Sequence, residues 1–292
     1  MWTDTLNRYQ EMIEQALRQY LPEAAPVDLA GKVTEAMRYS LLCGGKRIRP
    51  VLTLAFCELC GGDTEKALPF ACAVEMVHTY SLIHDDMPCM DNDDMRRGKP
   101  TNHKVYGEDM ALLAGDGLLT KAFETALLAE DKETAARAAL VLAQCAGEKG
   151  MVGGQCIDLQ TEGKDAGFSL LVTMDMGKTV ALISAACRMG CIAAHGDERL
   201  LTSAKQFAEG LGMAFQIRDD ILDVQGDPQK LGKNVGMDAA MDKRNYVSLL
   251  GVDRAQELVQ DYTEQALKAL NSFPGDTDFL RRLAESLVRR EA

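Results

Sequence analysis

The chain is poor in the residues that break helices or build sheets. Its 292 residues include only 8 prolines and 5% aromatic residues, and alternating runs of valine, isoleucine and threonine are nearly absent. This composition excludes a sheet-rich fold, because strands are enriched in β-branched and aromatic residues. Alanine, leucine, methionine, glutamate and lysine recur instead, and these lose least side-chain freedom in a helix. We therefore predict an all-α fold.

Basic blocks and long apolar runs are also missing. The net charge is -12 and no run of five or more lysines and arginines occurs, whereas a nucleic-acid partner normally leaves a basic footprint. No uninterrupted apolar run reaches the roughly 18 residues that suggest a membrane span, since Arg188 interrupts the best candidate. The polar start, Met1–Asp4, is unlike a signal peptide. We expect a cytoplasmic protein with no nucleic-acid partner and no stable membrane insertion.

The nine cysteines are an odd number scattered through apolar segments. Cys57 and Cys60 form a Cys-x-x-Cys pair, and Cys187 and Cys191 are four residues apart. A zinc site is the alternative interpretation, but the first pair lies in an apolar run and no histidine follows closely. We expect reduced cysteines buried as small hydrophobic residues.

No low-complexity linker or fixed repeat divides the sequence, so we predict a single domain over residues 1–292. Short glycine, proline and aspartate clusters, such as Gly44–Gly45 and Gly153–Gly154, mark loops between segments of about 15 to 30 residues. Each half contains an apolar helix that ends in an aspartate cluster, over Val74–Asp91 and over Phe207–Asp223.

The first aspartate cluster contains Asp85, Asp86 and Asp91. His78 lies seven residues before Asp85, so the two point almost the same way on a helix with 3.6 residues per turn. Pro88 is expected to end or bend this helix. The distorted segment after it can then bring Asp91 back towards Asp85.

The second cluster contains Asp219, Asp220 and Asp223, and Gln216 shares its polar stripe at helical spacing. Like charges at this spacing destabilise an isolated helix, so they need compensation. Mg2+ takes oxygen ligands and is usually held by one or two carboxylates together with substrate phosphates. A solvated helix end is the alternative for either cluster alone, but two such clusters predict divalent cations around a diphosphate.

Cationic residues flank both clusters. Gly44 and Gly45 come directly before Lys46, the first of these cations, and let the backbone approach a ligand closely. Guanidinium groups suit bidentate phosphate contacts, and lysine supplies a point charge. Each one alone is more often a surface charge, but together with His78 they indicate a site for two diphosphates. They are Lys46, Arg49, Arg96, Arg97, Lys178, Lys233 and Lys243.

Four motifs resemble those of the bacterial-type trans-isoprenyl diphosphate synthases: Gly44–Pro50, His84–Arg97, Lys178–Thr179 and Phe215–Asp223. They occur in the family's order from about Gly44 to Tyr246, which is most of the chain. The resemblance implies a helical bundle around a deep central cavity, usually in a homodimer. It also implies the reaction. An allylic diphosphate ionises, isopentenyl diphosphate attacks the cation, and loss of a proton leaves a chain one isoprene unit longer.

The resemblance also implies roles for single residues. About three Mg2+ ions, which Mn2+ can replace, would bind the diphosphates. Their ligands would be Asp85, Asp91 and Asp219, supported by Asp86, Asp220 and Asp223. The allylic diphosphate would be surrounded by Arg96, Lys178, Thr179, Gln216, Lys233 and Lys243. Isopentenyl diphosphate would be held by Lys46, Arg49, His78 and Arg97, with Gln155 and Asp158 near the substrates.

Product length is expected to depend on the helix below Asp85, where Tyr80 and Ser81 would face the growing chain. A bulky Tyr80 resembles the farnesyl-forming bacterial enzymes, although plain core packing is the alternative for it. The stretch from Pro88 to Lys104 also looks like geranylgeranyl diphosphate synthases, so farnesyl diphosphate is the prediction and geranylgeranyl diphosphate the alternative.

Two further alternatives remain, a non-catalytic subunit of a hetero-oligomeric prenyl synthase and a terpene cyclase of the same fold. Against the first, none of the aspartate and cationic positions is lost. Against the second, Lys46, Arg49 and His78 would have no purpose in an enzyme with one diphosphate substrate. The chain departs from the family pattern at Asn245 and Ser286, and Arg290 is a candidate terminal cation over isopentenyl diphosphate.

Overall fold

The structure, a computed structural model, describes residues 2–25, 28–161, 167–225 and 245–289. Helices make up nearly all of it, and strands β1 (Met95–Arg96) and β2 (Lys99–Pro100) pair in one short antiparallel hairpin. The all-α prediction is therefore confirmed. The helices are α1 (Trp2–Tyr20), α2 (Gly31–Leu41), α3 (Ile48–Leu59), α4 (Thr64–Asp85), α5 (Asn102–Tyr106), α6 (Glu108–Leu127), α7 (Lys132–Ala146), α8 (Met151–Thr161), α9 (Phe168–Asp175), η1 (Met176–Val180), α10 (Ala181–Ala193), α11 (Glu198–Gln225), α14 (Tyr246–Leu250), α15 (Val252–Ala269), η2 (Leu270–Ser272) and α16 (Asp278–Arg289).

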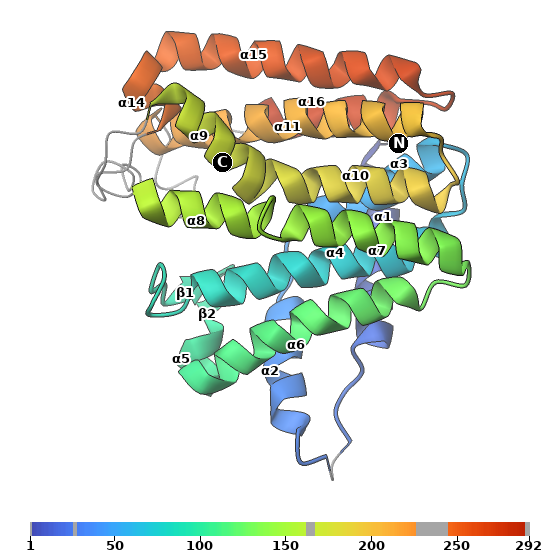
Figure 1. Cartoon of the computed structure of the whole chain (residues 1–292), viewed down its shortest axis with the longest axis vertical. Coiled ribbons are helices and arrows are strands. Elements are labelled where there is room, and N and C mark those ends of the chain that lie inside the picture. Colours follow the sequence, from blue (N-terminus) through green and yellow to red (C-terminus); the bar gives the residue numbers. More distant parts are fainter. Residues whose placement is uncertain (1, 26–27, 162–166, 226–244, 290–292) are drawn as a thin grey trace.

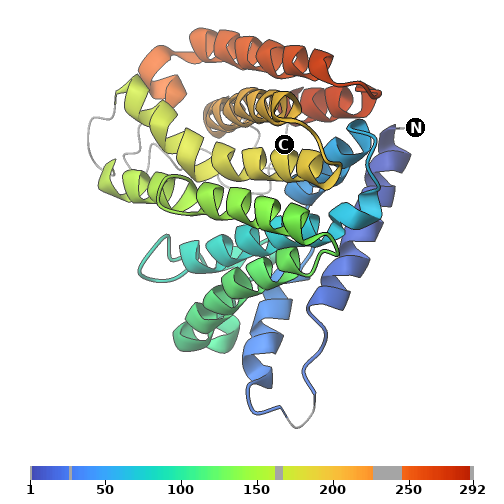
Figure 2. The same cartoon turned by 45° about the vertical axis from the view of Figure 1, so that its right-hand side comes forward.

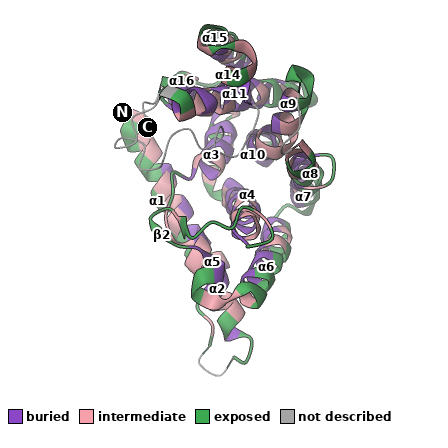
Figure 3. Cartoon of the chain, turned by 90° about the vertical axis from the view of Figure 1, so that its left-hand side faces the viewer, coloured by how far each residue is buried: buried purple, intermediate pink, exposed green. Residues whose placement is uncertain are grey.

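Helices α3, α4 and α10 form the centre of the bundle (Figure 3). Every residue of helix α3 from Pro50 to Cys57 is buried, and Leu52, Leu54 and Phe56 have no exposed surface. A helix that is hydrophobic all round is stable only when other elements cover it. Helices α4 and α10 pack against it from distant parts of the chain. Helices α1, α15 and α16 instead bury one face each and enclose this centre, with α1 along one side of the bundle (Figure 2).

Helices α4, α8 and α11 all run towards the same end of the bundle, where the β1–β2 hairpin lies (Figure 1). Two of these helices carry the predicted aspartate clusters at their last turns. The fold thus gathers at one end the segments that the sequence spreads over some 150 residues, from about residue 80 to about residue 225.

Gly153 and Gly154 lie inside α8, so the prediction of a loop there is wrong. A Cβ atom on Gly154 would come within 2.0 Å of the Lys178 backbone nitrogen and 2.6 Å of the Gly177 carbonyl carbon. Because Gly154 has no side chain, the backbones of α8 and η1 touch here. The glycine pair marks a close helix contact rather than a chain reversal.

The continuous helical stretch Phe168–Ala193 is long and apolar enough to cross a membrane, judged by length and composition. Half of its most apolar window is buried inside the fold, and core helices of soluble proteins pass the same test. The stretch also carries Lys178, one of the predicted diphosphate ligands, and α10 within it packs against α3, α7 and α11.

All nine cysteines are free thiols. Cys57, Cys187 and Cys191 are buried, as expected of core residues. Cys43 and Cys60 are half-buried. Cys89, in the turn after α4, and Cys156, on α8, are exposed, so the expectation of burial is wrong for these two.

Candidate active site

The first aspartate cluster is formed by the end of α4 and the turn that follows it. The helix ends at Asp85, three residues before Pro88, which agrees with the prediction that this proline ends or bends it. The backbone N–H of Asp91 donates to the carbonyl of Asp85 at 2.9 Å, while Asn92 adopts a positive φ of 52°. This turn reverses the chain and brings Asp91 back to Asp85, as the sequence analysis anticipated.

The carboxylate of Asp85 is unfavourable to ionise in the folded protein. Burial raises the pKa of Asp85 to about 6, and the neighbouring charges of Asp91 and Asp86 add to this, whereas Lys178 and Arg96 oppose it. A cation placed beside such a carboxylate stabilises its ionised form, and by more than it would stabilise an exposed carboxylate.

Asp86 already has a cationic partner. Its side chain is only 3% exposed, and Arg96 donates from Nε to its Oδ1 at 2.6 Å. Arg96 also bridges to Asp93 at 3.1 Å. Arg96 therefore reaches a diphosphate only by sharing or leaving these two carboxylates.

A cavity of about 630 Å³ opens between α3, α4, α8 and η1. It brings together predicted site residues from four separate segments of the chain. Apolar and weakly polar side chains complete the wall, among them Met151, Val152, Cys156 and Leu159 from α8. The predicted site residues that line it are Arg49, His78, Tyr80, Ser81, Asp85, Gln155, Lys178 and Thr179.

Lys178 and Thr179 project from η1, a π-helical turn between α9 and α10. Such turns are rare and often occur at functional sites. The ammonium of Lys178 pairs with Asp158, which comes from α8. This pair joins the two helices beside their contact at Gly154, so their spacing sets the position of Lys178.

Replacing Gly154 by alanine tests this contact. The added Cβ would meet backbone atoms, which cannot rotate away. We expect α8 to shift from η1, activity to fall about 100-fold, the cost of a ~1 Å misplacement of binding groups, and the free energy of unfolding to fall by about 1–3 kcal/mol. Steady-state kinetics and urea unfolding measure both effects. Gly167→Ala is the control, because nothing lies within 4 Å of its Cβ position. Wild-type activity in the Gly154 variant would contradict the role of this contact.

The second aspartate cluster is joined to the cavity wall. Thr179 donates a hydrogen bond from Oγ1 to Oε1 of Gln216 at 3.3 Å, which links η1 to α11. Asp219 and Asp223 lie on the same side of α11 as Gln216, at helical spacing. Asp220 is 7% exposed and accepts the backbone N–H of Tyr246 at 2.9 Å, so it connects α11 to α14.

Two buried donors face the cavity without a partner. Nε of Arg49 and Nε2 of Gln155 have no hydrogen-bond partner among the described residues. Nearly all buried polar groups in folded proteins are hydrogen-bonded, so each exception needs an explanation. An anionic ligand in the cavity would supply both acceptors.

His78 is a neutral hydrogen-bonding group in this site. Burial lowers its pKa well below the ordinary value, and the charges of Arg49 and Arg97 lower it further. Nη1 of Arg49 lies 3.4 Å from Nε2 of His78. Because a guanidinium can only donate, Nε2 is the acceptor, and the ring proton is on Nδ1.

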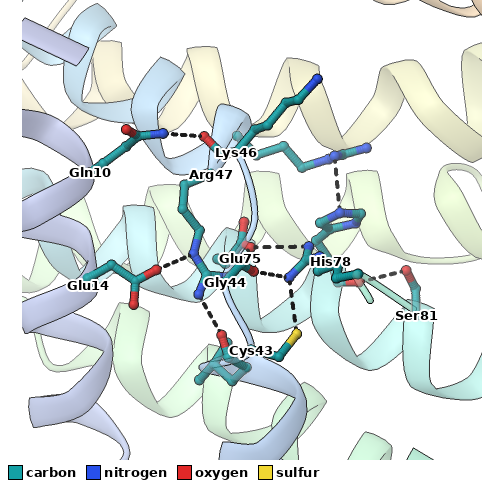
Figure 4. A network of polar contacts seen from close by, with 12 residues as sticks. Gln10, Glu14, Cys43, Gly44, Lys46, Arg47, Glu75, His78 and Ser81 are labelled. Atoms are coloured by element: carbon teal, nitrogen blue, oxygen red, sulfur yellow. Dashed lines mark hydrogen bonds and ion pairs between the residues drawn. The ribbon is translucent and has the colours of Figure 1, made fainter. Parts of the chain in front are cut away.

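The glycines before α3 wrap around the guanidinium of Arg97. Gly45 has a φ of 130°, and a Cβ there would lie 2.9 Å from Cζ of Arg97. Nη1 of Arg97 donates to the carbonyl of Gly44, and the carbonyl of Lys46 accepts from Gln10 (Figure 4). The side chain of Lys46 is exposed on this loop.

Two buried carboxylates close to the residues of this site were not found from the sequence. Burial raises the pKa of Asp175 to about 7, and Asp158 nearby raises it further. Its position three residues before Lys178, on the same helical face, was the available signal. Glu75 was also missed, although a charged residue inside the apolar stretch of α4 signals a buried ion pair.

Five further positions were singled out in the sequence, and the structure describes two of them. Lys233, Lys243 and Arg290 lie outside the described residues. Asn245 forms a capping box with Ser248 at the start of α14, which gives this departure from the family pattern a structural role. Ser286 donates to the carbonyl of Leu283 within α16.

The carboxylates suit Mg2+ by the chemistry of their donors, which are all oxygen atoms. Among the described residues, no three histidine, cysteine, aspartate or glutamate side chains surround a common point. The protein would therefore offer one or two carboxylates per ion, and the substrate and water would supply the rest. That division is usual for Mg2+ bound with phosphates.

Comparison with known proteins agrees with this geometry. Residues 31–278 match the family model described as polyprenyl synthetase. The chain is 43% identical over 290 residues to farnesyl diphosphate synthase of Geobacillus stearothermophilus, covering 98% of this chain and 97% of that protein. It is 45% identical over 274 residues to heterodimeric geranylgeranyl pyrophosphate synthase large subunit 1 of Arabidopsis thaliana, covering 91% and 73%.

A solved structure shows the same fold. The crystal structure of a farnesyl/geranylfarnesyl (FPP/GFPP) synthase from Zymomonas mobilis superposes with a TM-score of 0.87, at 35% identity, covering 99% of this chain and 100% of that one. The predicted helical bundle of isoprenoid synthases is confirmed. The chain thus belongs to the polyprenyl synthetase family, the prenyltransferases that extend isoprenoid chains head to tail.

Proposed function

We propose that this chain is a Mg2+-dependent farnesyl diphosphate synthase, which condenses isopentenyl diphosphate with dimethylallyl and geranyl diphosphates. The observation that carries the proposal is the charge arrangement of one cavity. Asp85 lies in its wall with a raised pKa, and unsatisfied donors of Arg49 and Gln155 lie in the same wall. Such a site favours an anion bound together with cations.

The carboxylates would hold the metal ions. We assign Asp85, Asp91 and Asp219 as ligands, with Asp86, Asp220 and Asp223 in support. Bound Mg2+ neutralises the diphosphate and makes it a better leaving group without proton transfer. Asp86 and Asp220 also have structural roles. Asp86 orients Arg96, and Asp220 fixes the start of α14.

The polar side chains of η1 and α11 would orient the allylic diphosphate. Lys178 supplies a point charge, and Thr179 and Gln216 hold each other in place by their hydrogen bond. Lys46, Arg49, His78 and Arg97 would bind isopentenyl diphosphate. His78 fits this role because it is neutral and accepts from Arg49, which keeps that guanidinium directed along the cavity wall.

The reaction breaks the carbon–oxygen bond of the allylic diphosphate and forms a carbon–carbon bond to isopentenyl diphosphate. The proton lost afterwards would pass to the departing diphosphate, because Nε2 of His78 already accepts from Arg49 and Asp85 is assigned to a metal ion. The apolar side chains of Met151, Val152 and Leu159 in the wall help to exclude water from the carbocation.

Tyr80 supports a farnesyl product. It lines the cavity five residues before Asp85, about 7.5 Å lower along the helix axis. Its ring packs edge-on against His84 with centroids 5.7 Å apart, so it is braced against displacement by a growing chain. Ser81 beside it is small and leaves room.

Tyr80→Ala is expected to lengthen the product to geranylgeranyl diphosphate or beyond, because it removes the braced ring from the cavity wall. Chromatography of the reaction products measures the change. Tyr80→Phe, which keeps the ring and removes only the hydroxyl, is the matched control and should leave chain length unaltered. Identical products from the wild type and the alanine variant would show that Tyr80 does not limit the length of the product.

A geranylgeranyl product is the second candidate. The specific observations in its favour are the stretch from Pro88 to Lys104 and the plant geranylgeranyl relatives. The deciding experiment incubates the pure protein with Mg2+, isopentenyl diphosphate and dimethylallyl, geranyl or farnesyl diphosphate. Farnesyl diphosphate as the final product from the first two starters supports the proposal. Rapid extension of the farnesyl starter supports the alternative.

The same assay separates the remaining alternatives. Turnover by the single purified protein excludes a non-catalytic subunit, and a hydrocarbon formed without isopentenyl diphosphate would identify a terpene cyclase. We further propose a cytoplasmic homodimer. The free state of all nine cysteines supports a reducing compartment. Exposed apolar side chains on the neighbouring helices α6 and α7 support self-association; they are Leu112, Leu113 and Leu140.

A further inference from the structure

Arg47 is surrounded by acceptors and cannot reach a ligand. It has a positive φ of 52°, and its side chain is 1% exposed. Nε donates to Glu14 at 2.8 Å, Nη1 to Glu75 at 2.7 Å and Nη2 to the carbonyl of Leu41 at 2.7 Å (Figure 4). All three nitrogens are therefore used inside the protein. Of the adjacent cations, Arg47 is structural, whereas Lys46 and Arg49 remain for substrate.

Glu75 is the inner anchor of this arrangement. Its side chain is 2% exposed and lies on α4, three residues before His78, so both lie on neighbouring turns of one helix face. The same Oε1 atom that accepts from Arg47 lies 3.9 Å from Nη2 of Arg97. Arg97 lies across the loop formed by Gly44 and Gly45.

The charge of Glu75 also acts on Arg49. Burial lowers the pKa of Arg49 and the charge of Arg97 lowers it further, while Glu75 opposes both. Three guanidinium groups thus share one buried carboxylate. Without it they would repel one another in the absence of substrate, and a buried cation without a partner is costly.

We propose that Glu75 is a positioning residue for isopentenyl diphosphate. It fixes Arg47, and through Arg47 both the loop that carries Lys46 and the start of α3 that carries Arg49, and it holds Arg97 at the edge of the same site. Glu75 itself touches no substrate. The inference rests on the proposed assignment of these cations to isopentenyl diphosphate.

Glu75→Gln distinguishes positioning from simple electrostatics, because the two predict opposite signs. Glutamine has nearly the same shape but no charge. If Glu75 acted only through the electric field of its charge, its loss would leave the site more positive, and the anionic substrate would bind more tightly. If it positions the cations, its loss lets the loop and Arg97 relax, and binding weakens.

We expect Glu75→Gln to raise KM for isopentenyl diphosphate by about 10-fold or more, while KM for the allylic substrate changes by less than about 2-fold. Glu58→Gln is the matched control. Glu58 also holds an arginine, Arg8, at 2.7 Å, but at the far end of α3, so both KM values should stay unchanged. An unchanged or lowered KM for isopentenyl diphosphate in Glu75→Gln overturns the proposal.

Circular dichroism and thermal unfolding establish whether Glu75→Gln folds. If it does not, Glu75→Asp replaces it, since aspartate keeps the charge but withdraws it by one methylene from Arg47 and Arg97. That variant is expected to raise KM for isopentenyl diphosphate by about 3- to 10-fold, and an unchanged value overturns the proposal equally.

Calorimetric titration with isopentenyl diphosphate in the absence of an allylic substrate separates this inference from the proposed function. Weaker binding to Glu75→Gln than to the wild type supports positioning even where turnover is not measured. A wild-type protein that neither binds isopentenyl diphosphate nor turns it over would refute the proposed function first.

Discussion

Chelation of divalent cations with EDTA is expected to reduce turnover by at least about 1000-fold, and added Mg2+ is expected to restore it. Diphosphate leaves an allylic carbon slowly unless its negative charge is neutralised, and the site offers electrostatic stabilisation in place of a general acid. The cationic side chains alone would have to do this without metal. Of these, Lys178 is already paired with Asp158, and Arg96 is paired with Asp86.

Product formation from radiolabelled isopentenyl diphosphate measures this dependence. Mn2+ is expected to replace Mg2+, since both take all-oxygen sites. A second measurement does not depend on turnover. Mg2+ and inorganic diphosphate together should raise the melting temperature of the protein more than either alone, because each completes the coordination of the other. Full activity after exhaustive chelation would contradict the assignment of both aspartate clusters.

Asp85→Asn is expected to lower kcat/KM by about 100- to 10,000-fold and to stabilise the metal-free protein at the same time. The loss of activity follows from removing a ligand charge at the position where the diphosphate is neutralised. The gain in stability follows from the pKa of Asp85, which burial raises to about 6. Since the pKa in the folded state exceeds that of the unfolded chain, the ionised carboxylate disfavours folding. That cost grows as the pH rises from about 4 to about 6 and is constant above.

Asparagine removes this cost, so the metal-free variant should be more stable above pH 6 by on the order of 1–3 kcal/mol, an upper bound because Asp85 is partly exposed. The difference should vanish below about pH 4, where Asp85 is protonated in both states. Urea unfolding at several pH values measures it. Asp94→Asn is the control, an exposed aspartate of the same run that pairs with Lys104, and it should leave activity unchanged. A variant at Asp85 with nearly normal activity, or with lower stability at neutral pH, would show that this carboxylate is not held for a cation.

The features predicted most accurately from the sequence were those within single helices. His78 and Asp85 share a cavity wall because residues seven apart on a helix point the same way. Asp91 folds back because proline prevents a regular helix from continuing. These outcomes depend only on local backbone geometry.

The predictions from sequence are wrong where the same residue type is compatible with two different structural environments. Gly153–Gly154 was interpreted as a loop, because glycine favours turns, but Gly154 in fact lets two helix backbones touch. The same residue type serves both purposes, and only the neighbouring helix decides between them. Cys89 and Cys156 are exposed against expectation for a similar reason, since composition tells neither whether the turn after α4 is covered nor which face of α8 is covered.

The helical fold, the two aspartate stripes and the set of cations available to balance them follow from the amino-acid order alone, because composition and helical period are properties of neighbouring residues. Which side chains meet as partners depends on how the helices pack. That packing joins Lys178 to Asp158, Thr179 to Gln216 and Arg47 to Glu75. Spacing along the chain carries no information about contacts between different helices. Those contacts depend on how helices pack, and packing separates the cations that hold the fold together from those left facing the cavity.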